Sequence, residues 1–164
     1  MAAYSSVRSR RFAAIKKEST KQIISFRLLD ECFALPIDSV QKVTPLGQIY
    51  GDPRGIGISL TNHEGKELLV LDIDRIFQNL FTKNNPAPIQ QRFLLVVENR
   101  AKDIIGLPID SAPTLRRVAI SSFKPLPKAY ANKGNIKFLS STTIQLKDNT
   151  PSILLLDPEK LFFQ

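Results

Sequence analysis

Leu35-Pro36-Ile37-Asp38-Ser39 occurs a second time in this chain, as Leu107-Pro108-Ile109-Asp110-Ser111, 72 positions later (107 − 35). A second echo closes each copy, because residues 68–77 align with residues 153–162, 85 positions later (153 − 68). The two echoes keep the same order in both halves, as chance matches rarely do. Two copies are too few for a solenoid, which needs about three or more repeats. The sequence therefore predicts two related halves, with 13 extra residues (85 − 72) inside the second.

Short apolar or alternating segments, separated by turn residues, run through both halves and favour strands. In order they are residues 23–29, 32–37, 58–61, 67–71, 91–97, 103–109, 136–146 and 152–156. Residues 39–43 fit either a helical turn or a third strand. Pro36 has no N–H, so its strand should lie at a sheet edge or have its ladder interrupted there. Many short strands with few helices predict an all-β architecture of small barrels.

Turn and cap signals place the connections between these strands. Asn62-His63-Glu64-Gly65 predicts a hairpin turn, because Gly65 can adopt a positive φ. Asp72 and Asp157 each follow an apolar strand and can cap a short helix. Pro158 suits the first helical position after the second of them. We therefore expect short helices after the strand that closes each half.

Charge and composition divide the chain into a tail and a body. Residues 1–21 carry six basic residues against Glu18, which accounts for +5 of the net charge of +8. This basic tail fits a solvated arm, a packed helix or a segment that binds an anionic surface. The predicted body spans residues 22–164, with a first barrel at 22–82, a linker at 83–88 and a second barrel at 89–164. The linker reads Lys-Asn-Asn-Pro-Ala-Pro, a composition typical of loops.

The cellular compartment follows from what the sequence lacks. No run of about 18 apolar residues occurs, so we expect no membrane span. The basic N-terminus is not followed by an apolar region, and this argues against a secretory signal. Cys32 is the single cysteine, so no internal disulfide can form. Together these features predict a cytoplasmic protein.

Catalytic patterns are weak in this sequence. The single histidine and the single cysteine, His63 and Cys32, fall in unrelated parts of the pattern, and no clustered set of zinc ligands exists. No glycine-rich phosphate loop is present. The repeated carboxylates are Asp38 with Asp110, and Asp72 with Asp157. They are explained more simply as turn formers and caps. We expect no catalytic residue, metal or cofactor, and an enzyme that uses paired aspartates is a weaker alternative.

Several segments, in order, resemble the CheW-like domain of bacterial chemotaxis scaffolds. Residues 33–43 read Phe-Ala-Leu-Pro-Ile-Asp-Ser-Val-Gln-Lys-Val, where that family typically reads y-x-l-p-i-d-x-V-q-e-i. Residues 62–77 align without a gap with the family's N-L-R-G-x-i-l-P-v-i-D-L-r-x-x-f. Residues 106–118, 123–127 and 153–161 fit later family segments. The ordered set is more specific than any one motif, and the resemblance covers about residues 22–164.

The resemblance implies two five-stranded, SH3-like β-barrels related by pseudo-twofold symmetry. It also implies a non-enzymatic signalling adaptor that couples a CheA-type histidine kinase to the tip of a chemoreceptor, in chemotaxis or related motility signalling. In the family, a groove between the barrels takes the receptor helices. A separate barrel face takes the kinase's CheW-like domain, and other CheW-like domains are further partners. The expected location is the cytoplasm, with recruitment to membrane receptor arrays.

The candidate receptor-binding residues follow from the same alignment. They are Ser39, Val40, Gln41, Val43, Asn62, His63, Glu64 and Gly65. Glu64 stands where the family has an arginine that helps hold the receptor, and His63 replaces the neighbouring leucine. Like-charge contacts across an interface can cost several kcal/mol. We therefore expect receptor coupling in a non-standard form.

A nucleic-acid-binding small β-barrel protein is the alternative reading, based on the basic tail. It predicts affinity that falls steeply with salt and aromatic side chains gathered on one barrel face. Most of the 10 phenylalanines lie in apolar strands or at helix ends, which argues against the second feature.

Overall fold

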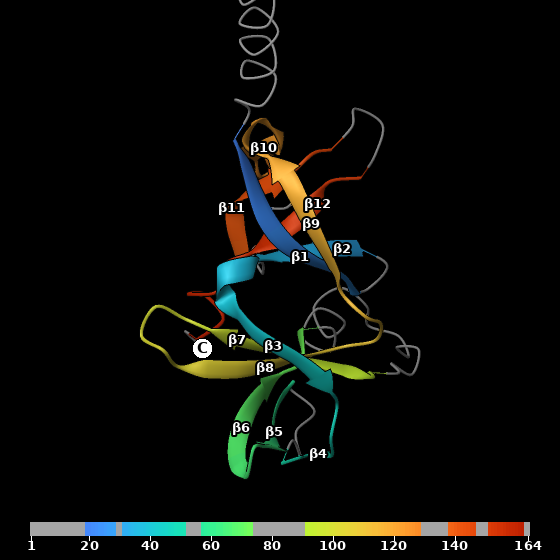
Figure 1. Ribbon diagram of the computed structural model, residues 1–164, viewed down its shortest axis with the longest axis vertical. Coiled ribbons are helices and arrows are strands. Elements are labelled where there is room, and N and C mark those ends of the chain that lie inside the picture. The colour runs from blue at the N-terminus through green and yellow to red at the C-terminus, as the bar shows by residue number, and fades with distance from the viewer. Residues whose placement is uncertain are drawn as a thin grey trace, which may run out of the picture.

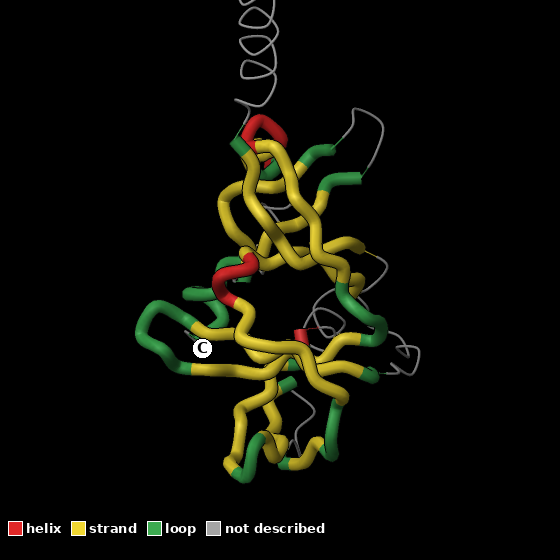
Figure 2. The backbone as a smooth tube through the Cα atoms, in the orientation of Figure 1, coloured by secondary structure: helices red, strands yellow, loops and turns green. Residues whose placement is uncertain are grey.

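Two six-stranded β-sheets, one above the other in Figure 1, make up the body of the protein. The computed structural model describes residues 19–28, 31–51, 57–73, 91–128, 138–146 and 151–162. The strands are β1 (Thr20–Leu28), β2 (Glu31–Pro36), β3 (Val40–Pro45), β4 (Ile49–Tyr50), β5 (Ile58–His63), β6 (Lys66–Leu71), β7 (Phe93–Glu98), β8 (Ile104–Ile109), β9 (Thr114–Ala119), β10 (Phe123–Pro125), β11 (Leu139–Ile144) and β12 (Ile153–Leu156). Two 3-10 turns, η1 (Ile37–Ser39) and η2 (Ile120–Ser122), interrupt them (Figure 2). The all-β prediction is confirmed, with six strands to a sheet where five were expected.

The two halves of the sequence exchange strands. The upper sheet has the order β10-β11-β12-β2-β1-β9, and the lower sheet has the order β4-β5-β6-β8-β7-β3. Each half thus gives its first two strands to one sheet and its later strands to the other. Matched strand by strand, the two orders are the same, so the sequence repeat appears in the fold as a pseudo-twofold relation.

The exchange corrects the barrel boundaries expected from the sequence. Neither 22–82 nor 89–164 delimits a sheet, because each sheet takes strands from both ranges. The expected linker, residues 83–88, lies outside the described residues. Residues 1–18 of the expected basic tail also lie outside them. β1 already begins at Thr20, so the last two residues assigned to the tail belong to a strand.

The repeated motifs meet at the centre of each sheet. β2 carries the first Leu-Pro pair and runs parallel to β12, with Ala34 opposite Leu155. β8 carries the second pair and runs parallel to β6, with Gly106 opposite Val70. Each copy of the first echo therefore pairs with the second echo of the other half. Both parallel ladders stop before the proline of the motif, as its missing N–H requires.

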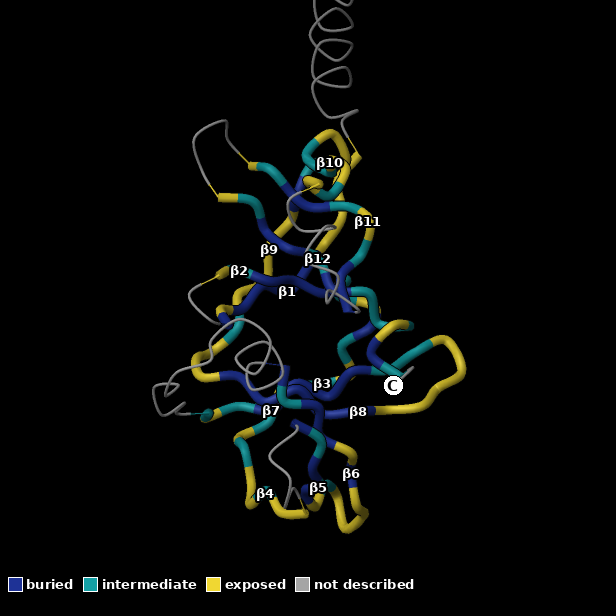
Figure 3. The backbone as a smooth tube through the Cα atoms, turned by 180° about the vertical axis from the view of Figure 1, so that it is seen from behind, coloured by how far each residue is buried: buried dark blue, intermediate teal, exposed yellow. Residues whose placement is uncertain are grey.

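The hydrophobic core has three parts, and the largest joins the two sheets. It contains Leu35 and Leu107, the first residues of the two repeats, both almost fully buried. A smaller cluster around Ile23 and Ile144 fills the upper sheet, and another around Val70 and Val96 fills the lower one. The central strands are therefore buried on both faces, which explains their nearly continuous apolar runs (Figure 3).

Of the two predicted short helices, the structure describes the segment after β12 but not the one after β6. After β12, Asp157 Oδ1 accepts the Glu159 N–H at 3.0 Å, as a cap does. The segment that follows is a hydrogen-bonded turn rather than a helix, with the Lys160 N–H donated to the Asp157 carbonyl at 3.0 Å. After β6, the residues beyond Ile73 lie outside the described part of the chain.

Candidate functional site

β3 forms one edge of the lower sheet and presents alternating side chains to solvent. Gln41, Val43 and Pro45 are exposed, whereas Val40 packs partly against the core. Val43 is 39% exposed, which is high for a valine on a regular strand. The register with β7 shifts between Val40 and Lys42, so a β-bulge re-aims the strand there.

The β5–β6 hairpin ends in a tight two-residue turn. His63 pairs with Lys66, and Glu64 and Gly65 between them have φ values of 51° and 77°. Positive φ at both central residues is the geometry of a type I′ hairpin turn. Glu64 is a non-glycine residue in the left-handed region, and both its backbone and its side chain therefore project at the tip.

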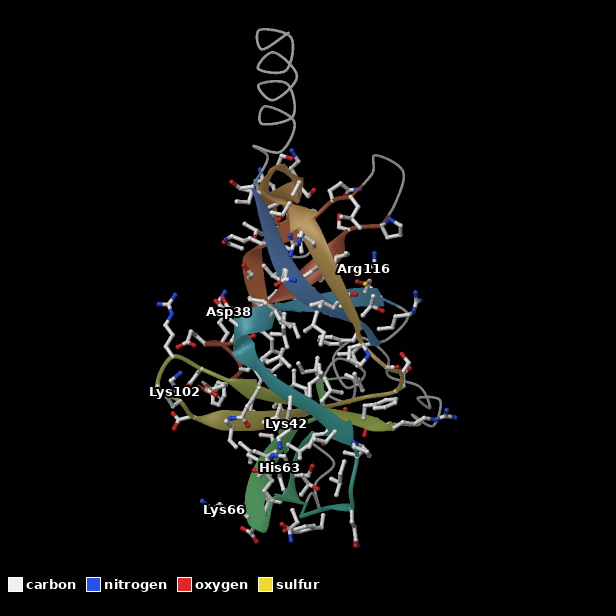
Figure 4. The ribbon with its side chains drawn as sticks, viewed as in Figure 1. Asp38, Lys42, His63, Lys66, Lys102 and Arg116 are labelled. Atoms are coloured by element: carbon white, nitrogen blue, oxygen red, sulfur yellow. The ribbon has the colours of Figure 1, made fainter. Side chains whose placement is uncertain are left out.

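An ion pair joins the hairpin tip to β3. The Lys42 ammonium donates to the Glu64 carboxylate, and the side chain of Glu64 is 64% exposed. The hydrogen bond and charge of Lys42, aided by His63, lower the pKa of Glu64 below its ordinary value. Figure 4 shows Lys42 and His63 close together on the lower sheet. We call the exposed part of β3 and the hairpin tip, made of Gln41, Lys42, Val43, His63 and Glu64, the β3–hairpin strip. Lys42 pairs with Val96 and Val43 with Leu95, so these two side chains leave opposite faces of β3.

His63 supplies a buried polar atom within this strip. Its side chain is only 10% exposed, and its Nε2 lies 4.0 Å from Glu64 Oε1. No hydrogen-bond partner for that nitrogen exists among the described residues. A buried polar atom without a hydrogen bond is costly.

A second polar link continues the strip along β7. Gln41 Nε2 donates to Glu98 Oε2 at 3.3 Å, and Lys102 Nζ lies 3.0 Å from Glu98 Oε1. The bulge residue is thereby tied to the neighbouring strand. The strip therefore combines one exposed apolar side chain with charged and amide groups on both sides.

Most of the sequence-based candidates lie in or beside the strip, but they differ in accessibility. Val43, Gln41 and Glu64 are exposed, and so are Asn62 and Gly65. Val40 and His63 are partly buried. Ser39 is buried, and its hydroxyl donates to the Pro36 carbonyl at 2.7 Å, which makes it a structural residue of η1.

Lys42 was missing from the candidates, although it holds the tip carboxylate. No local signal in the sequence points to it, because Lys42 on β3 and Glu64 in the β5–β6 turn lie 22 positions apart. The pairing itself depends on how a hairpin and an edge strand meet in space.

The residues considered for catalysis lie in different parts of the fold. Cys32 lies on β2 of the upper sheet, whereas His63 ends β5 of the lower sheet. Burial raises the pKa of the Cys32 thiol, while Arg116 and Arg27 oppose that rise. A raised pKa disfavours the reactive thiolate. Asp38 and Asp110 are both solvent-exposed, on η1 and after β8. Within the described ranges, no helix is long and apolar enough to cross a membrane.

Comparison with known proteins agrees with this geometry. Residues 22–164 match the CheW-like domain. The chain belongs to the CheW-like domain family. A solved structure, the scaffolding protein TtCheW from Thermoanaerobacter tengcongensis, superposes with a TM-score of 0.62 at 21% identity. The match covers 85% of this CheW-like chain and 90% of that protein, and it shows a shared fold. A search of curated proteins found no match.

Family membership gives the coarse function. CheW-like proteins are non-enzymatic scaffolds of chemotaxis signalling, so this chain is a scaffold or adaptor of that kind.

Proposed function

We propose that this CheW-like chain is a cytoplasmic adaptor that couples a CheA-type histidine kinase to a chemoreceptor tip, and that the β3–hairpin strip contacts the receptor. The observation that carries the proposal is the exposed Val43 on β3, the same strand from which Lys42 holds the hairpin carboxylate of Glu64. An apolar anchor bordered by charges is the surface that helix-in-groove recognition uses. Recruitment to receptor arrays in the membrane follows from this role.

The charge of the strip sets the partner's chemistry. Family members offer an arginine at the hairpin tip, and this chain offers an exposed Glu64 that forms an ion pair with Lys42. A receptor surface that matches it needs a base, or a neutral polar group, opposite Glu64. An acidic receptor surface is therefore disfavoured, since like-charge contacts cost several kcal/mol.

A binding measurement with a matched control tests the proposal. The probe is a purified helical-hairpin tip fragment of a chemoreceptor from the same organism, titrated by calorimetry. Val43→Asp should weaken binding about tenfold or more, because it places a charge in an apolar contact. Leu115→Asp changes the equivalent exposed residue of β9 and should alter binding by less than about twofold.

Binding of the kinase is measured in a separate titration. The CheW-like regulatory domain of the kinase should bind Val43→Asp as tightly as the unaltered chain, because we place its contact on another barrel face. Equal weakening of receptor binding by Val43→Asp and Leu115→Asp would contradict the proposed site. Absence of binding to both probes would contradict the adaptor role itself.

A further inference from the structure

β9 is the edge strand of the upper sheet, and no described strand pairs with its outer edge. It pairs with β1 alone among the described strands, through six consecutive residues without a bulge. Four consecutive residues, Thr114 to Arg117, are exposed. Leu115 is 58% exposed, more than any other large hydrophobic side chain in the described part of the chain. Long, regular, exposed edges invite pairing with another strand.

The hydrogen-bonding phase of β9 shows which backbone groups face outward. The Ile120 N–H donates to the Ser19 carbonyl at 3.0 Å, where the β1–β9 ladder begins. In an antiparallel pair, residues that exchange backbone hydrogen bonds with the partner strand alternate with residues whose N–H and C=O groups point away from it. Leu115, Arg117 and Ala119 therefore direct their N–H and C=O groups away from β1, toward the open edge.

β3 occupies the equivalent position in the lower sheet, but its edge is blocked. The Leu46 N–H donates to the Arg92 carbonyl at 2.9 Å, so Val43 and Pro45 are the outward residues there. Pro45 has no N–H to offer, and the bulge at Gln41 interrupts the regular spacing. Arg117 is the residue of β9 that is equivalent to Pro45 of β3. Of these two strands, only β9 therefore has an uninterrupted series of outward N–H donors.

The charge on this edge selects an acidic occupant. β1 and β9 together contain Lys21, Arg27, Arg116 and Arg117 and no acidic residue. Neither Arg116 nor Arg117 has a carboxylate partner among the described residues. The Arg116 Nε donates to Ser25 Oγ at 3.0 Å, which holds one side of the guanidinium group. The Arg116 side chain is otherwise exposed. Arg116 lies on the upper sheet, away from Lys42 (Figure 4).

We propose that the open edge of β9 binds an extended acidic segment of a partner protein by strand addition. Main-chain hydrogen bonds to Leu115 and Arg117 give the added strand its register, and side chains give it specificity. Antiparallel addition places acidic residues opposite Arg117 and Arg116 and then an apolar residue opposite Leu115. The recognised pattern, read from N to C, is therefore acid–acid–apolar, held by charge-assisted contacts.

The experiment uses the full chain and a labelled synthetic peptide with two glutamates followed by a valine, measured by fluorescence anisotropy. We expect saturable binding that weakens with salt. Arg117→Pro should reduce affinity about tenfold or more, because it removes one outward N–H and one charge. Arg117→Lys keeps both and should stay within about threefold. Lys66→Glu, an exposed change on the lower sheet, should also leave the affinity within about threefold.

A second measurement leaves the protein unchanged, in case Arg117→Pro fails to fold. A peptide N-methylated along its pairing edge should lose at least about tenfold in affinity, and the reversed order valine–glutamate–glutamate should bind more weakly. Equal binding of the N-methylated peptide would overturn strand addition. No saturable binding would also overturn it, and would leave the two arginines as guards against edge-to-edge aggregation. Self-association of the chain that Arg117→Pro abolishes would identify a second copy as the occupant and overturn the acidic-segment proposal.

Discussion

β3 and β9 are equivalent edge strands of the two sheets, and they differ in the residues that surround their exposed side chains. Both are edge strands, each on one sheet of the strand-exchanged fold. Val43 and Leu115 occupy equivalent places and are both exposed. Around them, β3 has Lys42 tied to a hairpin carboxylate and a blocking Pro45, whereas β9 has two arginines that pair with no carboxylate among the described residues. The repeat thus gives both sheets an equivalent edge strand, and a few substitutions give the two edges different chemistry.

The buried part of the repeat shows the opposite behaviour. Leu35 and Leu107 begin the two motifs and both lie in the core shared by the sheets. These two positions carry the same residue because each must fill an equivalent place in the close-packed core. Divergence of the two halves is therefore concentrated at the edges, where side chains meet solvent or partners.

The largest effect should come from dividing the chain between its halves. Residues 1–82 alone contain only β1 and β2 of the upper sheet, and residues 89–164 contain only β7 and β8 of the lower one. We predict that neither fragment folds alone and that mixing them restores the native fold, read as dispersed amide resonances. A well-dispersed spectrum from either fragment alone would contradict the strand exchange.

Truncating the repeated leucines should have the next largest effect. Leu35→Ala and Leu107→Ala each remove a fully buried side chain from the shared core, at a cost of about 2–5 kcal/mol. Both should lower the stability of one cooperative transition in urea, because the two sheets share that core. Leu115→Ala, an exposed change, should stay within about 0.5 kcal/mol. Two separate transitions, one for each sheet, would argue against a shared core.

The smallest effect concerns the ion pair at the hairpin tip. Lys42 lowers the pKa of Glu64, so the carboxylate should titrate below the ordinary glutamate value of about 4.3 in a carbon-detected pH titration. Because the folded-state pKa is lower than the unfolded one, the stabilising contribution is present above the ordinary pKa. It is lost as pH falls through the folded-state value. Lys42→Met should move the Glu64 pKa back toward its ordinary range, and an unchanged pKa would show that the pair does not form in solution.

Much of the fold could be read from the sequence, because its signals are local. The apolar runs, the Glu64-Gly65 turn and the paired motifs each predict their own element. The strand exchange could not be read in this way. Parallel pairing of Ala34 with Leu155 joins residues from opposite ends of the chain, and no local pattern encodes which half supplies the partner.

The candidate site shows the same limit at the level of single residues. The family resemblance made Gln41, Val43 and Glu64 receptor-contact candidates, and the structure leaves all three exposed. The resemblance could not separate exposed Val43 from half-buried Val40, since valine is common in both settings. It also could not see that the Ser39 hydroxyl turns inward to the Pro36 carbonyl, or that Lys42 reaches Glu64. These facts depend on the bulge and on how two strands meet.

Swapping the two charges of the tip tests the receptor-contact proposal most directly. Titrations with the receptor-tip fragment would compare the unaltered chain, Lys42→Glu, Glu64→Arg and the double variant that carries both changes. The double variant keeps an intramolecular ion pair but reverses its polarity. We predict that Glu64→Arg weakens binding about tenfold and that the double variant does not recover it, because the partner reads the sign of the tip charge. Unchanged binding by Glu64→Arg, or full recovery in the double variant, would contradict a receptor contact at Glu64.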